Sequence, residues 1–236
     1  MLPIHNEREN LSFLLGEIAR ALGATAHEIV AVDDGSTDGS LAELERLASG
    51  CPSLRIVQLE RRAGQSAAFA AGFDAARGEI VVTLDADGQH DPGDLPRMLV
   101  LLESPTAPSA VVGFRWPRAD SRWRRLQSGV ANAIRDLVTG DQVLDSACSL
   151  RVMRRSALAA VPRFDGMHRF LPTLIRMNGG RVIQVPVAHR PRRYGKSKYG
   201  MVDRAVRGLL DAFGVRWLRM RALRYTVRPN GVSRDR

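Results

Sequence analysis

The alternation of apolar runs with amphipathic segments constrains the fold of this chain more than any other feature. The expected strands are residues 28–34, 54–60, 79–87 and 109–115, and the expected helices are residues 38–49, 64–76 and 91–103. Strands separated by helices of about three turns indicate βαβ units, in which right-handed crossovers join parallel strands. The sequence therefore predicts an α/β fold with a mostly parallel, Rossmann-like sheet flanked by helices.

Size and composition agree with a folded domain. The 236 residues are 44% hydrophobic and 25% charged, values that allow a substantial core and exclude global disorder. Two cysteines, Cys51 and Cys148, form no disulfide framework, and no apolar run approaches the ~18 residues that span a bilayer. We therefore expect a reducing, cytoplasmic setting.

The charge of the chain points to anionic partners. A formal net charge of +10 favours polyanions, phosphorylated substrates or an anionic membrane surface. Aromatic residues make up only 6% of the chain, and no recognition module for nucleic acid is evident. We expect no nucleic-acid partner.

Two predicted strands end in acidic motifs, at the edge where open parallel sheets bind ligands. In LDADGQ, Asp85 and Asp87 are two residues apart, and an extended segment would direct both carboxylates to one side. With Gln89 they offer hard oxygen ligands that suit Mg²⁺ or Mn²⁺ carrying substrate phosphates. The alternative is a solvated turn in which Asp91 caps the following helix.

The second motif, VDDGSTDGS, places Asp33 and Asp34 after the first expected βα strand. Ser36 or Asp38 can cap the next helix, which leaves the two preceding acids available for hydrogen bonds to a base or ribose. Neither a Walker A loop nor a G-x-G-x-x-G fingerprint follows the first strand. This argues against P-loop NTPases and dinucleotide-dependent oxidoreductases.

Five segments together resemble a known enzyme family: LPIHNERENL, VDDGSTDGS, GQSAAFAAG, LDADGQHDP and the late R-x-x-G-x-S-K. The chain resembles the inverting GT-A glycosyltransferases of family 2, and more narrowly the dolichyl-phosphate mannosyltransferases and bacterial polyprenyl-phosphate glycosyltransferases. The segments occur in the order of the family. The resemblance implies a GT-A catalytic domain over residues 1–200 and a basic tail over residues 201–236.

The resemblance also implies roles for individual residues on the donor side. The residues that match the nucleotide-binding segments of the family are Pro3, Asn6, Glu7, Asp33 and Asp34. Those that match its metal site, holding Mg²⁺ or Mn²⁺ against the donor diphosphate, are Asp85, Asp87 and Gln89.

Basic residues are implied on both sides of the reaction. Arg115 and Arg124, with Ser128 nearby, match positions that bind the acceptor phosphate, whereas Arg192, Ser197 and Lys198 match the loop that closes over the donor phosphates. Lys196 and Lys198 are the two lysines among 35 basic residues. A loop that folds over a diphosphate suits a compact cation on a flexible stem better than a planar guanidinium.

The implied reaction moves a sugar from GDP-mannose or a UDP-sugar to a polyprenyl phosphate, either dolichyl or undecaprenyl, with inversion. Because a phosphate acceptor is already anionic near neutral pH, no general base is needed. Instead, the metal at Asp87, together with Lys198, would stabilise the charge of the departing diphosphate. Arg115 and Arg124 would hold the attacking phosphate. Three alternatives remain: transfer to a sugar hydroxyl in cell-surface polysaccharide synthesis, nucleic-acid binding and an inactive scaffold.

The C-terminal tail is basic and amphipathic. Val206, Leu210, Phe213, Trp217 and Met220 recur at helical spacing. Such a helix can lie on an anionic leaflet, here the inner face of the membrane, or pack on the core with a solvated arginine face. We expect peripheral association without a transmembrane helix, and a helix broken at its glycines, at positions 208 and 214.

Two positions depart from the family pattern. Only Met1 and Leu2 precede the P-x-x-N-E segment, where the family has a longer apolar strand, so we expect a shortened first strand and reduced stability. Gly88 stands where a small apolar residue is more usual, and the sequence assigns it no role.

Overall fold

The computed structural model describes residues 1–116, 136–194 and 201–222, with side chains in the last range from residue 208 onward. Several residues singled out in the sequence lie outside this description. They are Arg124, Ser128, Lys196, Ser197, Lys198 and the side chain of Val206.

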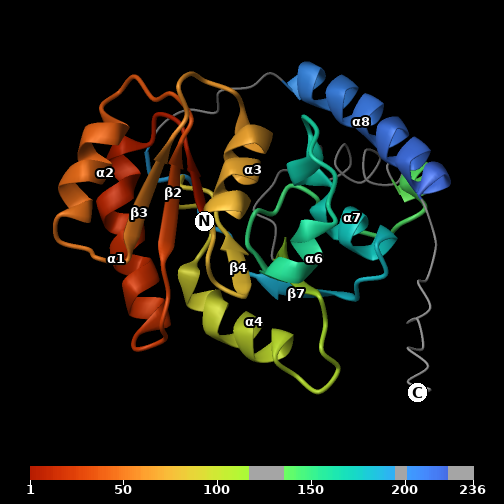
Figure 1. Cartoon of the computed structure of the whole chain (residues 1–236), viewed down its shortest axis with the longest axis horizontal. Coiled ribbons are helices and arrows are strands. Elements are labelled where there is room, and N and C mark those ends of the chain that lie inside the picture. The colour runs from red at the N-terminus through yellow and green to blue at the C-terminus, as the bar shows by residue number, and fades with distance from the viewer. Residues whose placement is uncertain (117–135, 195–200, 223–236) are drawn as a thin grey trace, which may run out of the picture.

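Strands and helices alternate through most of the described chain (Figure 1). The strands are β1 (Leu2–Ile4), β2 (Ile29–Asp33), β3 (Leu54–Gln58), β4 (Ile80–Thr83), β5 (Ala110–Arg115), β6 (Arg151–Arg154) and β7 (Val182–Val187). The helices are α1 (Arg8–Leu22), α2 (Ser40–Ala48), α3 (Gln65–Ala75), α4 (Leu95–Leu102), α6 (Arg155–Ala159), α7 (Leu171–Met177) and α8 (Met201–Arg221), with 3₁₀ turns η1 (Pro92–Asp94) and η2 (Met167–Arg169).

The first sheet consists of β1, β2 and β3, all parallel, with β2 in the middle. β1 has three residues, and Leu2 pairs with Ala31, so the first two residues of β2 extend beyond the paired part of β1. All five residues of β2 are buried, as expected for a central parallel strand covered on both faces. The expected βαβ order of this half is therefore confirmed.

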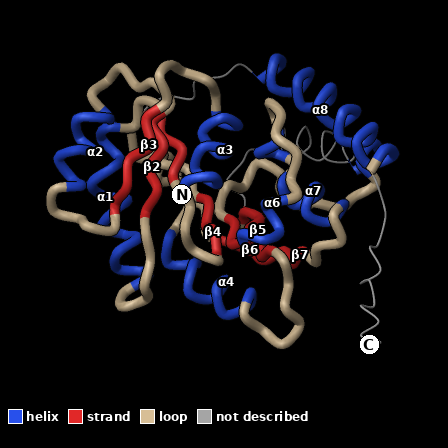
Figure 2. The backbone as a smooth tube through the Cα atoms, viewed as in Figure 1, coloured by secondary structure: helices blue, strands red, loops and turns tan. Residues whose placement is uncertain are grey.

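The second sheet has the order β4-β6-β5-β7. β5 and β7 are parallel, but β6 runs antiparallel to both of its neighbours, a reversal that the sequence did not predict. The two sheets meet at Met1, whose main-chain nitrogen donates to the carbonyl of Val82 at 2.8 Å and whose carbonyl accepts from the amide of Leu84 at 3.3 Å. Figure 2 shows the strands in the middle of the molecule with helices on both sides.

Two large apolar clusters, with a smaller third one between β2 and α3, cover the faces of the sheets. In one, Leu11 and Leu14 of α1 pack with Leu44 of α2, with α4 and with β1. In the other, Phe69 of α3 packs with Leu174 of α7 and with residues of β4, β5 and β6. Because helices occupy both faces, polar side chains that bind ligands gather at the carboxyl ends of the strands.

Helix α8 is continuous, so the expected break at its glycines is wrong. Nothing lies within 4 Å of where a Cβ would stand at Gly208 or Gly214, and a glycine inside a helix costs only about 1 kcal/mol. Ala212 and Val215 are fully buried against the cluster that contains α7. The opposite side exposes large apolar side chains, among them Leu210, Phe213, Trp217 and Met220. Within the described residues, no helix is both long and apolar enough to cross a membrane.

Candidate active site

One pocket of about 540 Å³ opens at the carboxyl ends of the strands. It draws on both sheets and on the segment after β7, and eight residues singled out in the sequence line it. They are Pro3, Glu7, Asp34, Asp85, Asp87, Gln89, Arg115 and Arg192. Asn6 and Asp33 are near this pocket in sequence but are not among its lining residues.

The acidic loop after β4 forms a turn. β4 ends at Thr83, so Asp85 and Asp87 lie beyond the strand, and the expectation of an extended segment here is wrong. Gly88 has a φ of 72°, in the left-handed region that side chains disfavour. The turn lets the amide of Gln89 donate to Oδ1 of Asp87 at 3.1 Å. This backbone requirement explains the glycine at position 88.

Asp85 is held by neighbours from α3 and from the segment before β6. Nε2 of Gln65, the first residue of α3, donates to Oδ1 of Asp85 at 2.9 Å, and the amide of Asp85 donates to Oγ of Ser149 at 3.0 Å. Burial raises the pKa of the Asp85 carboxyl to about 6, and the Asp87 carboxylate adds to the increase. The pair therefore carries negative charge that the protein compensates only in part.

The residues of this loop fit a divalent metal that is shared with substrate. Mg²⁺ and Mn²⁺ prefer oxygen ligands, and Mg²⁺ is often held by one or two carboxylates together with substrate phosphates. Asp85 and Asp87 supply such carboxylates. Across residues 1–116, 136–194 and 201–222, no three acidic, histidine or cysteine side chains gather into a complete metal site. A metal here would take its remaining ligands from substrate or water.

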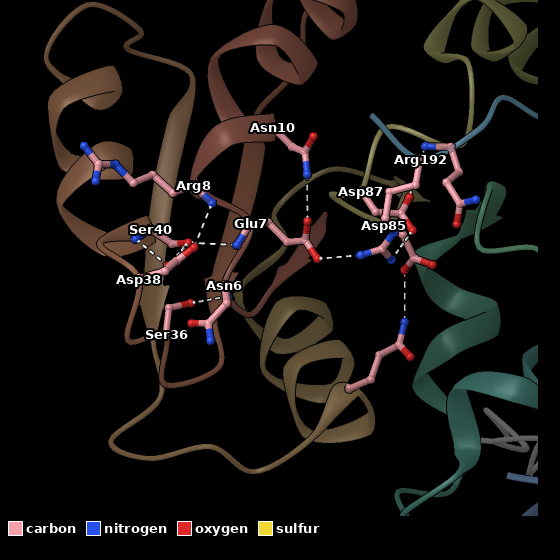
Figure 3. Close-up of polar contacts among 12 residues, drawn as sticks. Asn6, Glu7, Arg8, Asn10, Ser36, Asp38, Ser40, Asp85, Asp87 and Arg192 are labelled. Atoms are coloured by element: carbon pink, nitrogen blue, oxygen red, sulfur yellow. Dashed lines mark hydrogen bonds and ion pairs between the residues drawn. The ribbon is translucent and has the colours of Figure 1, made fainter. Parts of the chain in front are cut away.

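Arg192 lies between two acidic segments (Figure 3). Its Nη2 is 2.8 Å from Oδ2 of Asp87, and its Nη1 is 3.5 Å from Oε1 of Glu7. Glu7 in turn accepts from Nδ2 of Asn10, one turn into α1, at 2.8 Å. A residue 105 positions later in the chain than Asp87 thus brings a positive charge to the acidic loop.

Asn6 braces two loops. Its Oδ1 accepts from the amide of Thr37 at 2.7 Å, and its own amide donates to Oγ of Ser36 at 3.0 Å. Asn6 has a φ of 56°, a left-handed conformation that asparagine tolerates better than most residues. The loop after β1 is therefore tied to the loop after β2. Asn6 does not line the pocket, but it fixes the position of the loop that carries the lining residue Glu7.

The carboxylate of Asp34 accepts hydrogen bonds from the backbone just before α3. Its Oδ1 accepts from the amide of Ala63 at 2.6 Å, and its Oδ2 accepts from the amide of Gly64 at 3.0 Å. Asp33, 1% exposed, accepts from the amide of Ser36 at 3.3 Å. Both aspartates thus hold backbone in place, whereas the sequence interpretation had favoured Ser36 or Asp38 for backbone contacts and had left the two acids to the nucleotide.

Asp34→Ala is expected to lower the free energy of unfolding by about 2 kcal/mol, because it leaves two backbone amides without their charged acceptor. Urea denaturation of the two proteins measures this difference. Asp74→Ala, which removes a carboxylate that is 72% exposed, is the control and is expected to change stability by less than about 0.5 kcal/mol. An unchanged midpoint for Asp34→Ala would show that the carboxylate does not support the loop.

Comparison with known proteins identifies the family. Residues 1–161 match the model of Glycosyl transferase family 2. The chain belongs to this family. It is 36% identical to the dodecaprenyl-phosphate galacturonate synthase of Rhizobium johnstonii over 97% of the chain and 68% of that protein. It is 39% identical to the undecaprenyl-phosphate 4-deoxy-4-formamido-L-arabinose transferase of Edwardsiella ictaluri over 86% of the chain and 62% of that protein.

A solved structure supports the GT-A fold of this family 2 member. The glucosyl-3-phosphoglycerate synthase of Mycobacterium tuberculosis, in complex with Mn²⁺, UDP-glucose and phosphoglyceric acid, aligns with a TM-score of 0.69 at 23% identity. The alignment covers 91% of this chain and 78% of that one. The predicted fold class is confirmed, with the antiparallel β6 as the detail that the sequence missed.

Arg115, which also lines the pocket, is held by Asp145. Nε of Arg115 donates to Oδ2 at 2.6 Å and Nη2 donates to Oδ1 at 2.9 Å, a bidentate pair. Asp145 is 5% exposed, so this pairing fixes the plane of the guanidinium. No sequence pattern marked Asp145, which lies in a stretch without strand or helix periodicity.

Sequence reasoning missed three further polar residues around the acidic loop. Gln65 stands in the GQSAAFAAG segment, which carried the resemblance without a role for that side chain. Ser149 had no signal, because it reaches the loop through the pairing of β6 with β4. His90 stands in the LDADGQHDP segment, which carried the resemblance without a role for that side chain. Burial lowers the pKa of His90 to about 4, so its imidazole is neutral near neutral pH.

Proposed function

We propose that this family 2 glycosyltransferase moves a sugar from a nucleotide sugar to a polyprenyl phosphate, with inversion at the anomeric carbon. The observation that carries the proposal is a single pocket that joins the acidic pair Asp85 and Asp87 to two arginines, Arg115 and Arg192. Two relatives are named for transfer to dodecaprenyl and undecaprenyl phosphate, which supports a polyprenyl phosphate over a sugar hydroxyl as acceptor.

On the donor side, Asp85, Asp87 and Gln89 would hold Mg²⁺ or Mn²⁺, which would neutralise charge on the departing diphosphate. Pro3 and Glu7 would border the nucleotide. Asn6, Asp33 and Asp34 would support it mainly through the loops that they hold in place. Arg192 would bind the diphosphate, together with Ser197 and Lys198 beyond the described residues.

On the acceptor side, Arg115 would orient the attacking phosphate, and Arg124, outside the described residues, would assist. One phosphate oxygen forms the new bond to the anomeric carbon as the bond from that carbon to the diphosphate breaks, and no proton moves. Positioning and charge stabilisation are then the main catalytic tasks. Asp145 would act as a positioning residue that keeps the Arg115 guanidinium turned toward the pocket.

Release of nucleoside diphosphate tests the proposal. The purified chain is incubated with UDP- and GDP-sugars, with Mg²⁺ or Mn²⁺, and with or without a short polyprenyl phosphate. We expect turnover of at least one donor that requires both the metal and the lipid phosphate. Turnover that needs a sugar hydroxyl instead of the lipid phosphate would favour the alternative transferase, and no turnover of any donor would contradict the proposal.

A polyprenyl acceptor requires contact with a membrane surface, and α8 is suited to it. Leu210, Phe213, Trp217 and Met220, the apolar stripe of α8, are 54% to 66% exposed at a spacing of three and four residues. Arg216 donates to the carbonyl of Val138 at 3.0 Å, so this arginine helps hold the helix on the domain. We propose that the apolar stripe lies in the headgroup region of an anionic membrane, in line with the net charge of +10.

Replacing Phe213 and Trp217 with serine is expected to weaken binding to vesicles that contain an anionic lipid by about 2 kcal/mol, a loss of more than about tenfold. Vesicle sedimentation measures the change. Val100→Ser is the control, because Val100 is 69% exposed on α4, away from α8 in Figure 1. Equal binding of the double variant and the control would contradict the role of the apolar stripe.

A further inference from the structure

The guanidinium of Arg192 brings positive charge next to the acidic side chains of the pocket. It contacts Oδ2 of Asp87 at 2.8 Å and approaches Oε1 of Glu7 at 3.5 Å, while Asp85 lies two residues from Asp87. The Arg192 side chain is 26% exposed and that of Asp87 is 11% exposed. A charge-assisted hydrogen bond in such a partly buried setting is stronger than one on an open surface.

The backbone that carries Arg192 is held by other contacts. The amide of Arg190 donates to the carbonyl of Gln89 at 2.8 Å, and the Arg190 guanidinium pairs with Glu17 on α1 at 2.7 Å and with Asp91. The guanidinium of Arg193 stacks 4.2 Å above the ring of Phe13 on α1. The segment is therefore anchored on both sides of residue 192, and the Arg192 side chain can change partners while its backbone stays in place.

We propose that Arg192 is the counter-ion of Asp87 before metal binds, and that it makes the binding of metal depend on the nucleoside diphosphate. The inference rests on the proposed function, because it takes Asp85 and Asp87 as the metal ligands. It adds that Arg192 competes with the divalent ion for Oδ2 of Asp87. Arg192 would thus couple the binding of the divalent metal to the binding of the nucleoside diphosphate, in addition to contacting the phosphates itself.

The coupling follows from the charges. A divalent ion on Asp87 and a guanidinium on the same oxygen repel each other, so Arg192 must leave Oδ2 when the metal binds. Glu7 alone, at 3.5 Å, is a weak substitute partner. A diphosphate offers the planar guanidinium two oxygens at once, which is the geometry that arginine prefers. Diphosphate therefore favours metal binding and, by linkage, metal favours diphosphate to the same extent.

Mn²⁺ binding measured by the EPR signal of the free ion tests the inference, because it does not depend on turnover. The full chain is titrated with Mn²⁺ alone and again with saturating UDP or GDP. For Arg192→Ala we expect Mn²⁺ alone to bind about tenfold more tightly than in the unmodified chain. The ratio of the two Mn²⁺ dissociation constants, without and with nucleotide, should shrink by about the same factor.

Arg163→Ala is the matched control, because it removes one positive charge from an arginine–carboxylate pair, Arg163 with Asp74 at 2.9 Å, outside the pocket. We expect its Mn²⁺ affinity to stay within about twofold of the unmodified chain. Arg192→Gln, which keeps a polar side chain without the charge, should repeat the result of Arg192→Ala. Circular dichroism of all three variants checks that they are folded.

The possible failures can be told apart. If the unmodified chain binds Mn²⁺ in the presence of a nucleoside diphosphate, but neither Arg192 variant binds Mn²⁺ alone more tightly, the competition is refuted and the proposed function stands. If no protein binds Mn²⁺ with either nucleotide, the metal assignment of the proposed function fails and the competition fails with it.

Discussion

Asp87→Asn is expected to lower turnover about 10³-fold while leaving the fold intact. The carboxylate of Asp87 accepts from the Gln89 amide and pairs with Arg192, and it faces the same pocket as Asp85. An amide of the same shape keeps the turn but removes the charge that would bind the metal. Initial rates of nucleoside diphosphate release at saturating metal and donor measure the loss.

Asp74→Asn provides the control for this experiment, because Asp74 is 72% exposed and, within the described part of the chain, pairs with a surface arginine, Arg163. Its rate should stay within about twofold of the unmodified chain. A rate for Asp87→Asn within about tenfold of the unmodified chain would place the metal elsewhere. In that case Asp87 would serve only as the partner of Arg192.

The second large effect is a pH-dependent gain of stability in Asp85→Asn. The folded-state pKa of Asp85 is about 6, raised from 3.8 by burial first and by Asp87 second. A raised carboxyl pKa stabilises the fold fully below the unfolded value, and this stabilisation is lost as the pH rises through the folded value. The metal-free protein should therefore lose about 2.4 kcal/mol of stability from this group between pH 4 and pH 7.

Asparagine keeps the acceptor oxygen for Gln65 but has no charge, so the variant should become more stable than the unmodified chain as the pH rises through this window. Urea denaturation in EDTA at pH 4, 5, 6 and 7 measures the difference between the two proteins. The difference is the informative quantity, because His90, whose pKa is lowered to about 4 by burial, gives a pH dependence of opposite sign in both. A difference that is constant from pH 4 to pH 7 would refute the raised pKa.

The sequence predicted the elements whose signals are local. The strands β2, β3 and β5 and the helices α2 and α3 agree with the predicted ranges within two residues at each end, since apolar runs and helical spacing mark them. β6 was missed because it is four residues long and follows no crossover pattern. The apolar spacing of α8 was recognised, but only packing of Ala212 and Val215 shows which side of the helix faces the domain.

The candidate site divides in the same way. Asp85 and Asp87 were found because acids at strand ends meet at one edge of a parallel sheet. Gln65, Asp145 and Ser149 reach the site through contacts between segments 20 to 64 residues apart, and no local pattern marks them. The use of Asp34 as a backbone acceptor also required coordinates, since an acid before a glycine can cap a helix or face a ligand equally well.

The late position of the arginine segment in the chain bears on how the protein folds. The loops after β1 and β2 meet through contacts between residues about 30 positions apart, as in the pair Asn6 and Ser36, whereas the pair Glu17 and Arg190 is 173 positions apart. Closing a longer loop costs more chain entropy, and non-local contacts slow folding. We therefore expect the first sheet to form early, and the contacts of the segment that carries Arg192 to form later. A growing chain on the ribosome would carry an acidic pocket without its counter-ion until residue 192 has been added.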